Sequence, residues 1–463
     1  MKPFRFTTWT KKKFILFFFC FFIITWTFSS LNLEGKYINK THEIESPSQK
    51  QSIDLDITNL HRLNQELIVK ASLKNNLTIG VFTPIEFTVL LYGSNPTNGN
   101  DQWVLLQNST NQRNVTCEKK SLCDSNTLVH ENYIHYTNYK TEIVIENLID
   151  WQFYNLVEIE YNYVSKYLTY FKLFFQYILV MILITWTGIY FYKLRDVEFK
   201  NLPLEQKWLI IMLVSLIFFN NPLHPVTLLS SSLFWRTISL IFTSIFFIEL
   251  FGGWLCVLGG FRTPKRHFRG FYLPKFLLLG LIFILFLSLL IWRENHSINH
   301  PEYESVTSIP SYCAFRTILT ILFVYYWLWA FYSLTGSYSH VKQIKKMELK
   351  RRFMFFVIIS TIPFFFTFQV LFTILYSKDT YSPIEFMAVF FMYNFYLLGY
   401  SYACLPNKLS PNQENNTNHS ENSDSKDSIG SDLSNATDLK IISINSSLSD
   451  YSDQPEKKLF QKN

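Results

Sequence analysis

Charged residues are scarce in this chain of 463 residues: Asp, Glu, Lys and Arg make up 17% of it. A soluble domain usually carries about 25%. Hydrophobic residues reach 49%, and the aromatic share of 18% includes 46 Phe. The shortage of charge falls in long apolar blocks, which an ordinary soluble domain does not contain. The composition therefore predicts an integral membrane protein.

Cysteine is also scarce, with six residues and no CxxC zinc spacing. This excludes the dense disulfide framework of a small secreted domain. Cys117 and Cys123 are the only pair in a hydrophilic segment, and they enclose five residues. We predict a disulfide between them, because two free thiols do not suit an oxidising compartment.

Enzyme and cofactor motifs are absent. The sequence contains no H-E-x-x-H, G-x-S-x-G or Walker A pattern, and no helix-turn-helix or zinc-ligand pattern. The net charge of +7 comes from short basic clusters beside the apolar blocks, where they face lipid headgroups. We therefore predict a protein with no catalytic residue, cofactor, metal or nucleic-acid partner.

Eight apolar blocks are long enough to cross a bilayer, which requires roughly 20 residues of helix. In lipid such blocks must be helices, because backbone polar groups have to be satisfied internally. The blocks cover residues 14–31, 167–192, 208–229, 234–258, 273–292, 313–335, 353–376 and 384–404. The third contains Pro222 and Pro225, so it is either a kinked span or a re-entrant segment.

Basic residues alternate between the predicted loops and give the orientation. Basic clusters mark the cytoplasmic side. The clusters comprise Lys2, Arg5, Lys11, Lys12 and Lys13, then Lys193, Arg195, Lys200 and Lys207, then Arg262, Lys265, Arg266 and Arg269, and finally Lys342, Lys345, Lys346, Lys350, Arg351 and Arg352. Both termini are thus predicted to be cytoplasmic. The five regions are then a cytoplasmic N-terminus (1–13), an anchor (14–31), a luminal or extracellular domain (32–166), a seven-helix domain (167–404) and a tail (405–463).

The first block has two interpretations. It has the basic start of a signal peptide, and Ser29 and Ser30 would mark the cleavage site. Its length exceeds a usual signal-peptide core, and no A-x-A-like site follows, which favours an uncleaved anchor.

The luminal region has the alternation of short β-strands. Ile85, Phe87, Val89 and Leu91 fall on one face of residues 84–92. Further strands are predicted at 67–73, 103–106, 142–145 and 157–163, with turns at 93–96 and 98–100. Several short strands at this spacing predict a β-sandwich, while residues 34–52 are expected to be a linker.

Asn-x-Ser/Thr sequons support the same orientation. Asn76, Asn108 and Asn114 lie in the luminal region, and Asn295 lies in the predicted outside loop after residue 292. We predict glycosylation at these four positions. The Ser- and Asn-rich tail is expected to be disordered, with a weak sorting-signal pattern at 438–442, so sorting machinery is a candidate partner there.

Ionisable and polar groups inside the apolar blocks are the candidate site residues, because burying charge in lipid is costly. Glu249 and Arg236 share one block but are 13 positions apart, too far to pair along one helix. Glu249 either hydrogen-bonds within the bundle or lines a cavity. His224 and Asn394 are predicted to hydrogen-bond between helices, with the same cavity role as the alternative.

Four short strings carry a resemblance to a known family. They are Trp254-Leu255-Cys256-Val257 followed by Gly260-Phe261-Arg262, then Phe271-Tyr272-Leu273-Pro274-Lys275-Phe276, Asn394-Phe395-Tyr396 and Asn220-Asn221-Pro222. Over most of residues 55–405 the chain resembles the transmembrane protein 181 family, which belongs with the Wntless-like seven-helix proteins. The resemblance implies a luminal sandwich of the GOLD type before the helices. It also implies a secretory-pathway (Golgi or endosome) or plasma-membrane protein that escorts a secreted or lipidated cargo. In Wntless itself, the cargo lipid enters a cavity among the helices.

The leading hypothesis is therefore a non-enzymatic cargo receptor whose partners are the bilayer and a luminal cargo. A G-protein-coupled signalling receptor is the alternative, although the Asp-Arg-Tyr and Asn-Pro-x-x-Tyr patterns of the rhodopsin-like class are missing. A transporter would require paired discontinuous helices, and only residues 220–225 look interrupted.

Overall fold

The computed structural model describes most of the chain between residues 37 and 406. The described residues are 12–13, 16–17, 19–20, 23, 37–45, 51–75, 81–95, 102–117, 123, 126–131, 134–146, 154–230, 232–263, 267–299, 309–344, 347–376 and 383–406. Most of the predicted anchor, the predicted turn at 98–100 and nearly all of the predicted tail, with the 438–442 pattern, lie outside them.

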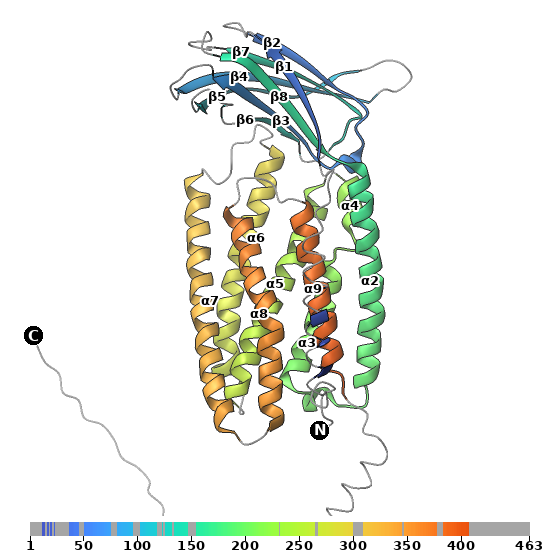
Figure 1. The fold of residues 1–463 in the computed structure, drawn as a ribbon, viewed down its shortest axis with the longest axis vertical. Coiled ribbons are helices and arrows are strands. Elements are labelled where there is room, and N and C mark those ends of the chain that lie inside the picture. The colour runs from blue at the N-terminus through green and yellow to red at the C-terminus, as the bar shows by residue number, and fades with distance from the viewer. Residues whose placement is uncertain are drawn as a thin grey trace, which may run out of the picture. The chain divides into compact units, whose positions relative to one another are not determined.

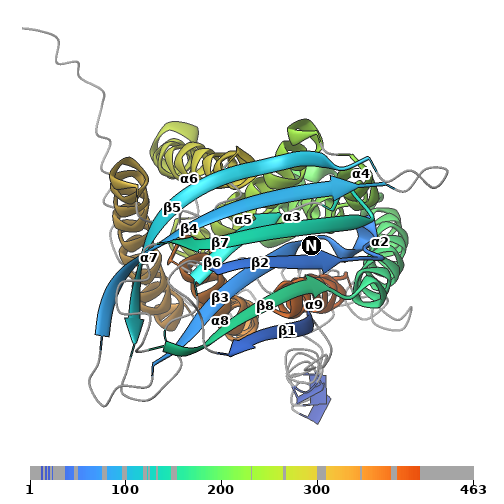
Figure 2. The ribbon, with the colours of Figure 1, turned by 90° about the horizontal axis from the view of Figure 1, so that it is seen from above.

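Eight antiparallel strands form two four-stranded sheets, as the predicted sandwich requires (Figures 1 and 2). One sheet has the order β1-β8-β3-β6 and the other β2-β7-β4-β5. The strands are β1 (Tyr37–Glu45), β2 (Gln51–Ile57), β3 (Leu67–Asn75), β4 (Val81–Ser94), β5 (Val104–Cys117), β6 (Asn126–Glu131), β7 (Asn138–Glu146) and β8 (Tyr154–Val164). A 3₁₀ turn, η2 (Arg62–Asn64), precedes β3.

The predicted linker at 34–52 is wrong, because β1 lies within it and β2 begins there. β1 pairs with β8 from Tyr37↔Val164 to Glu45↔Leu156. Its sequence is mostly polar, so its strand state comes from hydrogen bonding to β8 and not from an apolar pattern. β6 was also not predicted.

Alternation along the strands builds the sandwich core. Ile85, Phe87, Val89 and Leu91 of β4 are at most 3% exposed. Inward residues of β2, β3, β7 and β8 meet them in one cluster. Each such side chain contributes about 1.5–3 kcal/mol when it leaves water, so the predicted apolar face is the one that holds the two sheets together.

The helical region follows β8 directly. Its helices are α2 (Lys166–Leu194), α3 (Leu204–Phe219), α4 (His224–Leu229), α5 (Leu233–Arg262), α6 (Leu273–Asn299), α7 (Pro310–Gln343), α8 (Met347–Tyr376) and α9 (Pro383–Ala403), as Figure 1 shows. Two short turns are η4 (Phe199–Asn201) and the π-helical η5 (Phe268–Tyr272). Their buried side chains form one continuous core.

In the described part of the chain, six helical stretches are long and apolar enough to cross a membrane. They are Lys166–Leu194, Leu204–Leu229, Leu233–Arg262, Phe268–Ile298, Pro310–Gln343 and Met347–Tyr376. The second combines α3 and α4, which agrees with a kinked span. α9 is not among these six stretches. It has 21 residues, which is long enough to cross the membrane, and it packs into the same core, so we keep it as the predicted seventh span.

Two helices extend further than predicted. α6 continues to Asn299 and α7 begins at Pro310, so both ends of the predicted outside loop at 293–312 are helical. Polar residues such as Arg293, Glu294 and Asn295 prolong α6 beyond its apolar stretch, because helical hydrogen bonding does not require an apolar side chain.

Candidate functional site

A reciprocal amide pair joins two of the family-like strings inside the bundle. Asn220 Nδ2 donates to Asn394 Oδ1 at 2.8 Å, and Asn394 Nδ2 donates to Asn220 Oδ1 at 2.9 Å. Asn394 Nδ2 also donates to the Phe390 carbonyl of its own helix at 2.7 Å. Both asparagines are fully buried. The predicted interhelical role of Asn394 therefore has a definite partner at the end of α3.

The break after α3 is stabilised by side chains of α2 and α5. Asn221 takes the left-handed conformation, with φ 47°, and Pro222 follows it. Gln176 of α2 donates to the carbonyls of Asn220 and Asn221, the latter at 3.2 Å. Asn221 Nδ2 donates to Ser239 Oγ of α5 at 2.8 Å. Irregular backbone at membrane depth survives only where protein groups satisfy it, so these contacts explain how the chain tolerates the interruption.

A second polar contact set lies around Tyr396. Its hydroxyl accepts a hydrogen bond from Trp254 Nε1 at 3.2 Å and shares one with Ser360 at 3.1 Å. The Trp254 string of α5 and the Asn394-Phe395-Tyr396 string of α9 are thereby joined to α8. These family-like residues fix helix packing.

The Phe271 to Phe276 string has a similar structural role. Lys275 is 4% exposed, and its ammonium lies 3.4 Å from the centre of the Phe271 ring. A Cβ added to Gly259 would lie 2.7 Å from Lys275 Nζ. Glycine at the end of α5 thus makes room for the lysine, and a cation–π contact holds it.

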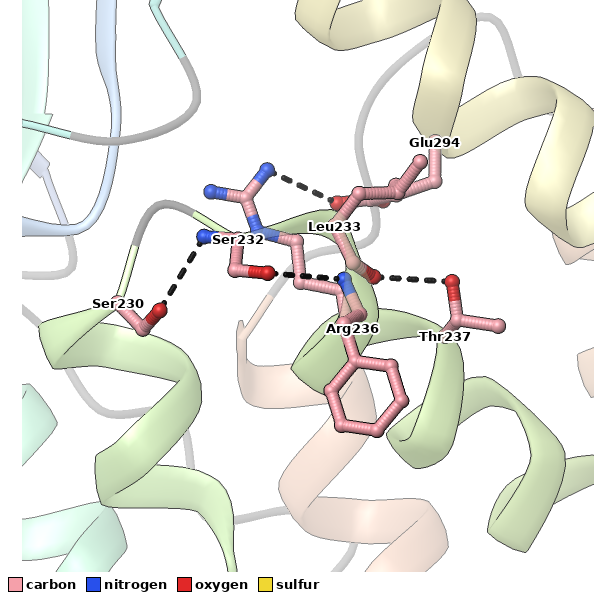
Figure 3. Close-up of polar contacts among 7 residues, drawn as sticks. Ser230, Ser232, Leu233, Arg236, Thr237 and Glu294 are labelled. Carbon is pink, nitrogen blue, oxygen red and sulfur yellow. Dashed lines mark hydrogen bonds and ion pairs between the residues drawn. The ribbon is translucent and has the colours of Figure 1, made fainter.

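The four candidate cavity residues do not meet at one point. Asn394 contacts Asn220, and Glu249 lies beside Ser215 of α3. Arg236 pairs with Glu294 of α6, NH1 to Oε1 at 3.6 Å, and is 5% exposed (Figure 3). His224 is half-buried, and its Nε2 has no hydrogen-bond partner in the structure.

The Arg236–Glu294 pair lies at the start of α5, where Ser232 caps the helix by accepting a hydrogen bond from the Phe234 amide at 3.3 Å (Figure 3). Arg236 also acts electrostatically on Glu131 of β6. Burial raises the pKa of the Glu131 carboxyl from 4.5 to about 7, while Arg236 acts in the opposite direction. A buried arginine of the bundle thus acts on an acidic side chain of the sandwich.

Hydrogen bonds around η2 also connect the sandwich to the helices. Thr169 of α2 donates from Oγ1 to the Leu63 carbonyl at 2.7 Å, and Arg62 donates to the Leu229 carbonyl of α4 at 3.4 Å. Asn64 Nδ2 donates to the Val164 carbonyl at the end of β8 at 2.8 Å. The sandwich is therefore connected to α2 and α4 by more than the covalent chain.

The predicted modification sites fall in different surroundings. Asn108 is exposed on β5, whereas Asn295 is exposed on α6 and not in a loop. Asn114 lies in β5, and Asn76 lies outside the described residues. Cys123 is buried and disulfide-bonded. The side chain of Cys117, at the end of β5, is outside the described set, so the predicted pairing stays a prediction.

Two surface features were not predicted from the sequence. One is an exposed apolar stretch at the start of β5, which had been predicted only as a strand. The other is an apolar groove between α5, α7 and α8. Both depend on which neighbours cover a side chain, and hydropathy alone does not carry that information. Among the described residues there is no group of three or more His, Cys, Asp or Glu that could hold a metal ion.

Comparison with known proteins agrees with the position of the helical region in the chain. The family described as Wntless-like, transmembrane domain, matches residues 165–408, which is more than half of the chain and runs from the start of α2 past the end of α9. Human transmembrane protein 181 is 25% identical over 426 residues, covering 88% of this chain and 88% of that protein. The predicted resemblance is confirmed, and the chain belongs to the Wntless-like family of multi-pass membrane proteins.

Proposed function

We propose that the protein is a non-enzymatic receptor of the secretory pathway or plasma membrane that binds and escorts a secreted or lipidated cargo through its GOLD-like sandwich. Its family is not known as enzymatic. The observation that carries the proposal is an exposed apolar stretch on an edge strand of the sandwich.

This stretch, which we call the β5 strip, consists of Trp103, Val104, Leu105 and Leu106. These residues are 41%, 48%, 50% and 36% exposed, respectively. The register of β5 against β4 shifts between Leu91 and Tyr92, which face Gln107 and Leu105. Leu106 is therefore the extra residue of a bulge, and this irregularity lets consecutive apolar side chains face outward.

The β5 strip also lies at an open edge. Among the described strands, β5 pairs with β4 alone, and Figure 2 shows it at the outer side of its sheet. An edge strand presents unpaired backbone groups, and proteins normally protect such edges with charge or proline. The β5 strip is the apolar, uncharged part of this edge, since β5 continues with polar residues and Arg113, and such a part fits the addition of an extended segment of another protein. A secreted polypeptide is a partner of that kind.

The charge pattern supports the required orientation. Lys193, Arg262 and Lys342 lie in the last turns of α2, α5 and α7. The sandwich precedes the first turn of α2, so these positive residues lie at the end of the bundle that is far from the sandwich. With this end cytoplasmic, the sandwich is luminal or extracellular and both termini are cytoplasmic. The β5 strip is then available to cargo and not to cytosolic proteins.

Proximity labelling from a tag in the luminal sandwich tests this function. We expect secreted proteins to be enriched with the wild type and lost with Leu105→Asp. The matched control is Gln112→Asp, which places the same charge on an exposed position of the same strand and should retain the enrichment. Surface expression is compared for all three.

Equal enrichment for both variants at matched surface expression would contradict cargo binding by the β5 strip. Enrichment of G proteins by a tag on the cytoplasmic side, without secreted proteins in the luminal experiment, would favour the signalling alternative instead.

A further inference from the structure

A half-open groove runs between three helices in the half of the bundle nearest the basic loops. Trp254 and Leu258 of α5 form its floor. Ala330 and Leu334 of α7 line one wall, and Val357 and Thr361 of α8 line the other. Its volume is about 510 Å³, including the space that is open to the outside. The groove differs from the polar contacts of Asn220 and Asn394, which it does not include.

The polar atoms in this groove already have partners. Ser360 shares a hydrogen bond with the Tyr396 hydroxyl at 3.1 Å, and Thr361 donates to the Val357 carbonyl at 2.7 Å. Trp254 Nε1 donates to Tyr396. The remaining lining is hydrocarbon and aromatic. A ligand inside the groove is therefore recognised by packing alone, which suits a hydrocarbon chain.

The two ends of the groove differ. Toward the start of α7, the Trp327 ring packs on Phe364 at 4.5 Å and on Phe368 at 4.9 Å between centroids. Toward the basic loops, Tyr338 and Phe353 are 6.5 Å apart, and Tyr338 is 56% exposed. An exposed tyrosine is typical of the membrane interface. At one end of the groove, Trp327 thus packs on the lining residue Phe364, and at the other end the interfacial Tyr338 lies one turn beyond the lining residue Leu334.

The lining of the groove on α8 is about as long as one leaflet is thick, while its lining on α7, from Ala330 to Leu334, is shorter. Its lining on α8 extends from Phe356 to Phe365, which is about 14 Å of helix at 1.5 Å per residue. Half of the hydrocarbon core is about 15 Å. A single acyl chain entering from the interface would reach Phe365 near the middle of the membrane.

Basic residues lie on α7 and α8 beyond the end of the groove that is nearest the basic loops. Lys350 lies seven residues before Val357, on the same face of α8, and Lys342 lies one turn after Tyr338 on α7. Glu348 and Arg351 are exposed nearby. Arg352 is engaged by Glu205 of α3, with its NH2 2.7 and 2.8 Å from the carboxylate oxygens. The excess of positive charge at this end attracts an anionic headgroup.

We propose that this groove binds one acyl chain of an anionic phospholipid of the adjacent leaflet, with the headgroup beside Lys342 and Lys350. The site is separate from the proposed cargo surface, because the β5 strip lies in the sandwich. The phospholipid is a resident lipid that fills the space between α7 and α8, and it is not cargo.

Photo-crosslinking in nanodiscs tests the site. The full-length protein is reconstituted with a trace of phosphatidylserine or phosphatidylcholine that carries the same photoactivatable acyl chain, and labelled residues are mapped by mass spectrometry. We expect phosphatidylserine to label the walls of the groove on α7 and α8 above all other lipid-facing positions. Phosphatidylcholine should label these walls no more than the rest of the surface.

A matched pair of variants gives the control. Thr361 is exposed and Thr373 is half-buried on α8, and each donates to the carbonyl four residues earlier, at 2.7 and 3.0 Å. Only Thr361 lines the groove. Thr361→Trp should fill it and reduce labelling of the walls to the level of the surrounding surface, whereas Thr373→Trp should leave labelling unchanged.

A second variant tests the headgroup without filling the groove. Lys342→Gln combined with Lys350→Gln should remove the preference for phosphatidylserine. The proposal is overturned if wild-type labelling is uniform over the lipid-facing surface, if both lipids label the walls equally, or if Thr361→Trp labels like Thr373→Trp.

Discussion

Asn220 and Asn394, which are 174 positions apart in the sequence, exchange two amide hydrogen bonds of 2.8 and 2.9 Å in the interior of the bundle. The pair joins the interrupted end of α3 to the middle of α9. The Asn220 carbonyl also accepts a hydrogen bond from Gln176 of α2. Asn220 therefore connects α2, α3 and α9 around the break.

Removing one partner of this pair should destabilise the bundle. We expect Asn394→Ala to lower the free energy of unfolding by about 1–2 kcal/mol, because the Asn220 amide is left buried without its partner. A double-mutant cycle with Asn220→Ala should give a coupling of about 0.6–1.7 kcal/mol. Thermal unfolding in detergent micelles measures both.

An exposed amide on a neighbouring helix is the control for this experiment. Gln369 of α8 is exposed, so Gln369→Ala should leave the unfolding temperature unchanged. Additive effects of the two asparagine substitutions would show that the amide pair does not couple α3 to α9.

The sequence predicts the membrane helices well because bilayer thickness sets the length of each apolar block. It also locates the interruption at Pro222, since proline ends a helix locally. The partner of Asn220 could not be predicted, because that contact spans 174 positions and depends on the packing of α3 against α9.

The sandwich shows the same limit. β4 and β8 follow from their alternating apolar residues, while β1 does not, because its residues are mostly polar and its strand state depends on pairing with β8. Of the predicted candidates, Arg236 and Asn394 are buried, whereas Glu249 and His224 are half-buried. The rotation of each helix about its axis determines which neighbour each of these side chains faces. The hydropathy pattern of the sequence does not contain that rotation.

Close packing at Gly252 leads to a second prediction. A Cβ added there would lie 3.2 Å from the Trp208 ring and 3.3 Å from Leu279. Gly252→Ala therefore requires the Trp208 and Leu279 side chains to shift by a few tenths of an ångström, and we expect this variant to be less stable than the control by about 1–3 kcal/mol. The matched control is Gly188→Ala in α2, where no atom lies within 4 Å of the added carbon. A similar unfolding temperature for both variants would contradict this account of the helix packing.

Glycosylation offers a test of the orientation. Asn108 is exposed on β5, so a luminal sandwich should carry a glycan there, and Asn108→Gln should increase gel mobility to the extent of one glycan. Asn435 in the tail should remain unmodified, because the basic loops predict a cytoplasmic tail. Site mapping by mass spectrometry after glycosidase treatment measures both, and a glycan on Asn435 would contradict the proposed topology.

The last prediction concerns the pH dependence of stability at Glu131. Burial raises the pKa of this carboxyl from 4.5 to about 7 in the folded protein. Between these values the folded state holds a proton that the unfolded state has released, so the free energy of unfolding falls as the pH rises from 4.5 to 7. Below this window both states are protonated and Glu131 has no effect. Above it, the folded protein carries a buried charge that Arg236 offsets only in part.

Glu131→Gln keeps the shape of the side chain and removes the ionisation. The variant should equal the wild type at pH 4.5 and be more stable at pH 7.5, by at most about 3 kcal/mol, since each pKa unit corresponds to 1.36 kcal/mol. Thermal unfolding at both pH values measures this difference in stability. If the wild type gained stability relative to Glu131→Gln from pH 4.5 to 7.5, the ionised carboxylate would be stabilised beside Arg236, which would contradict the prediction.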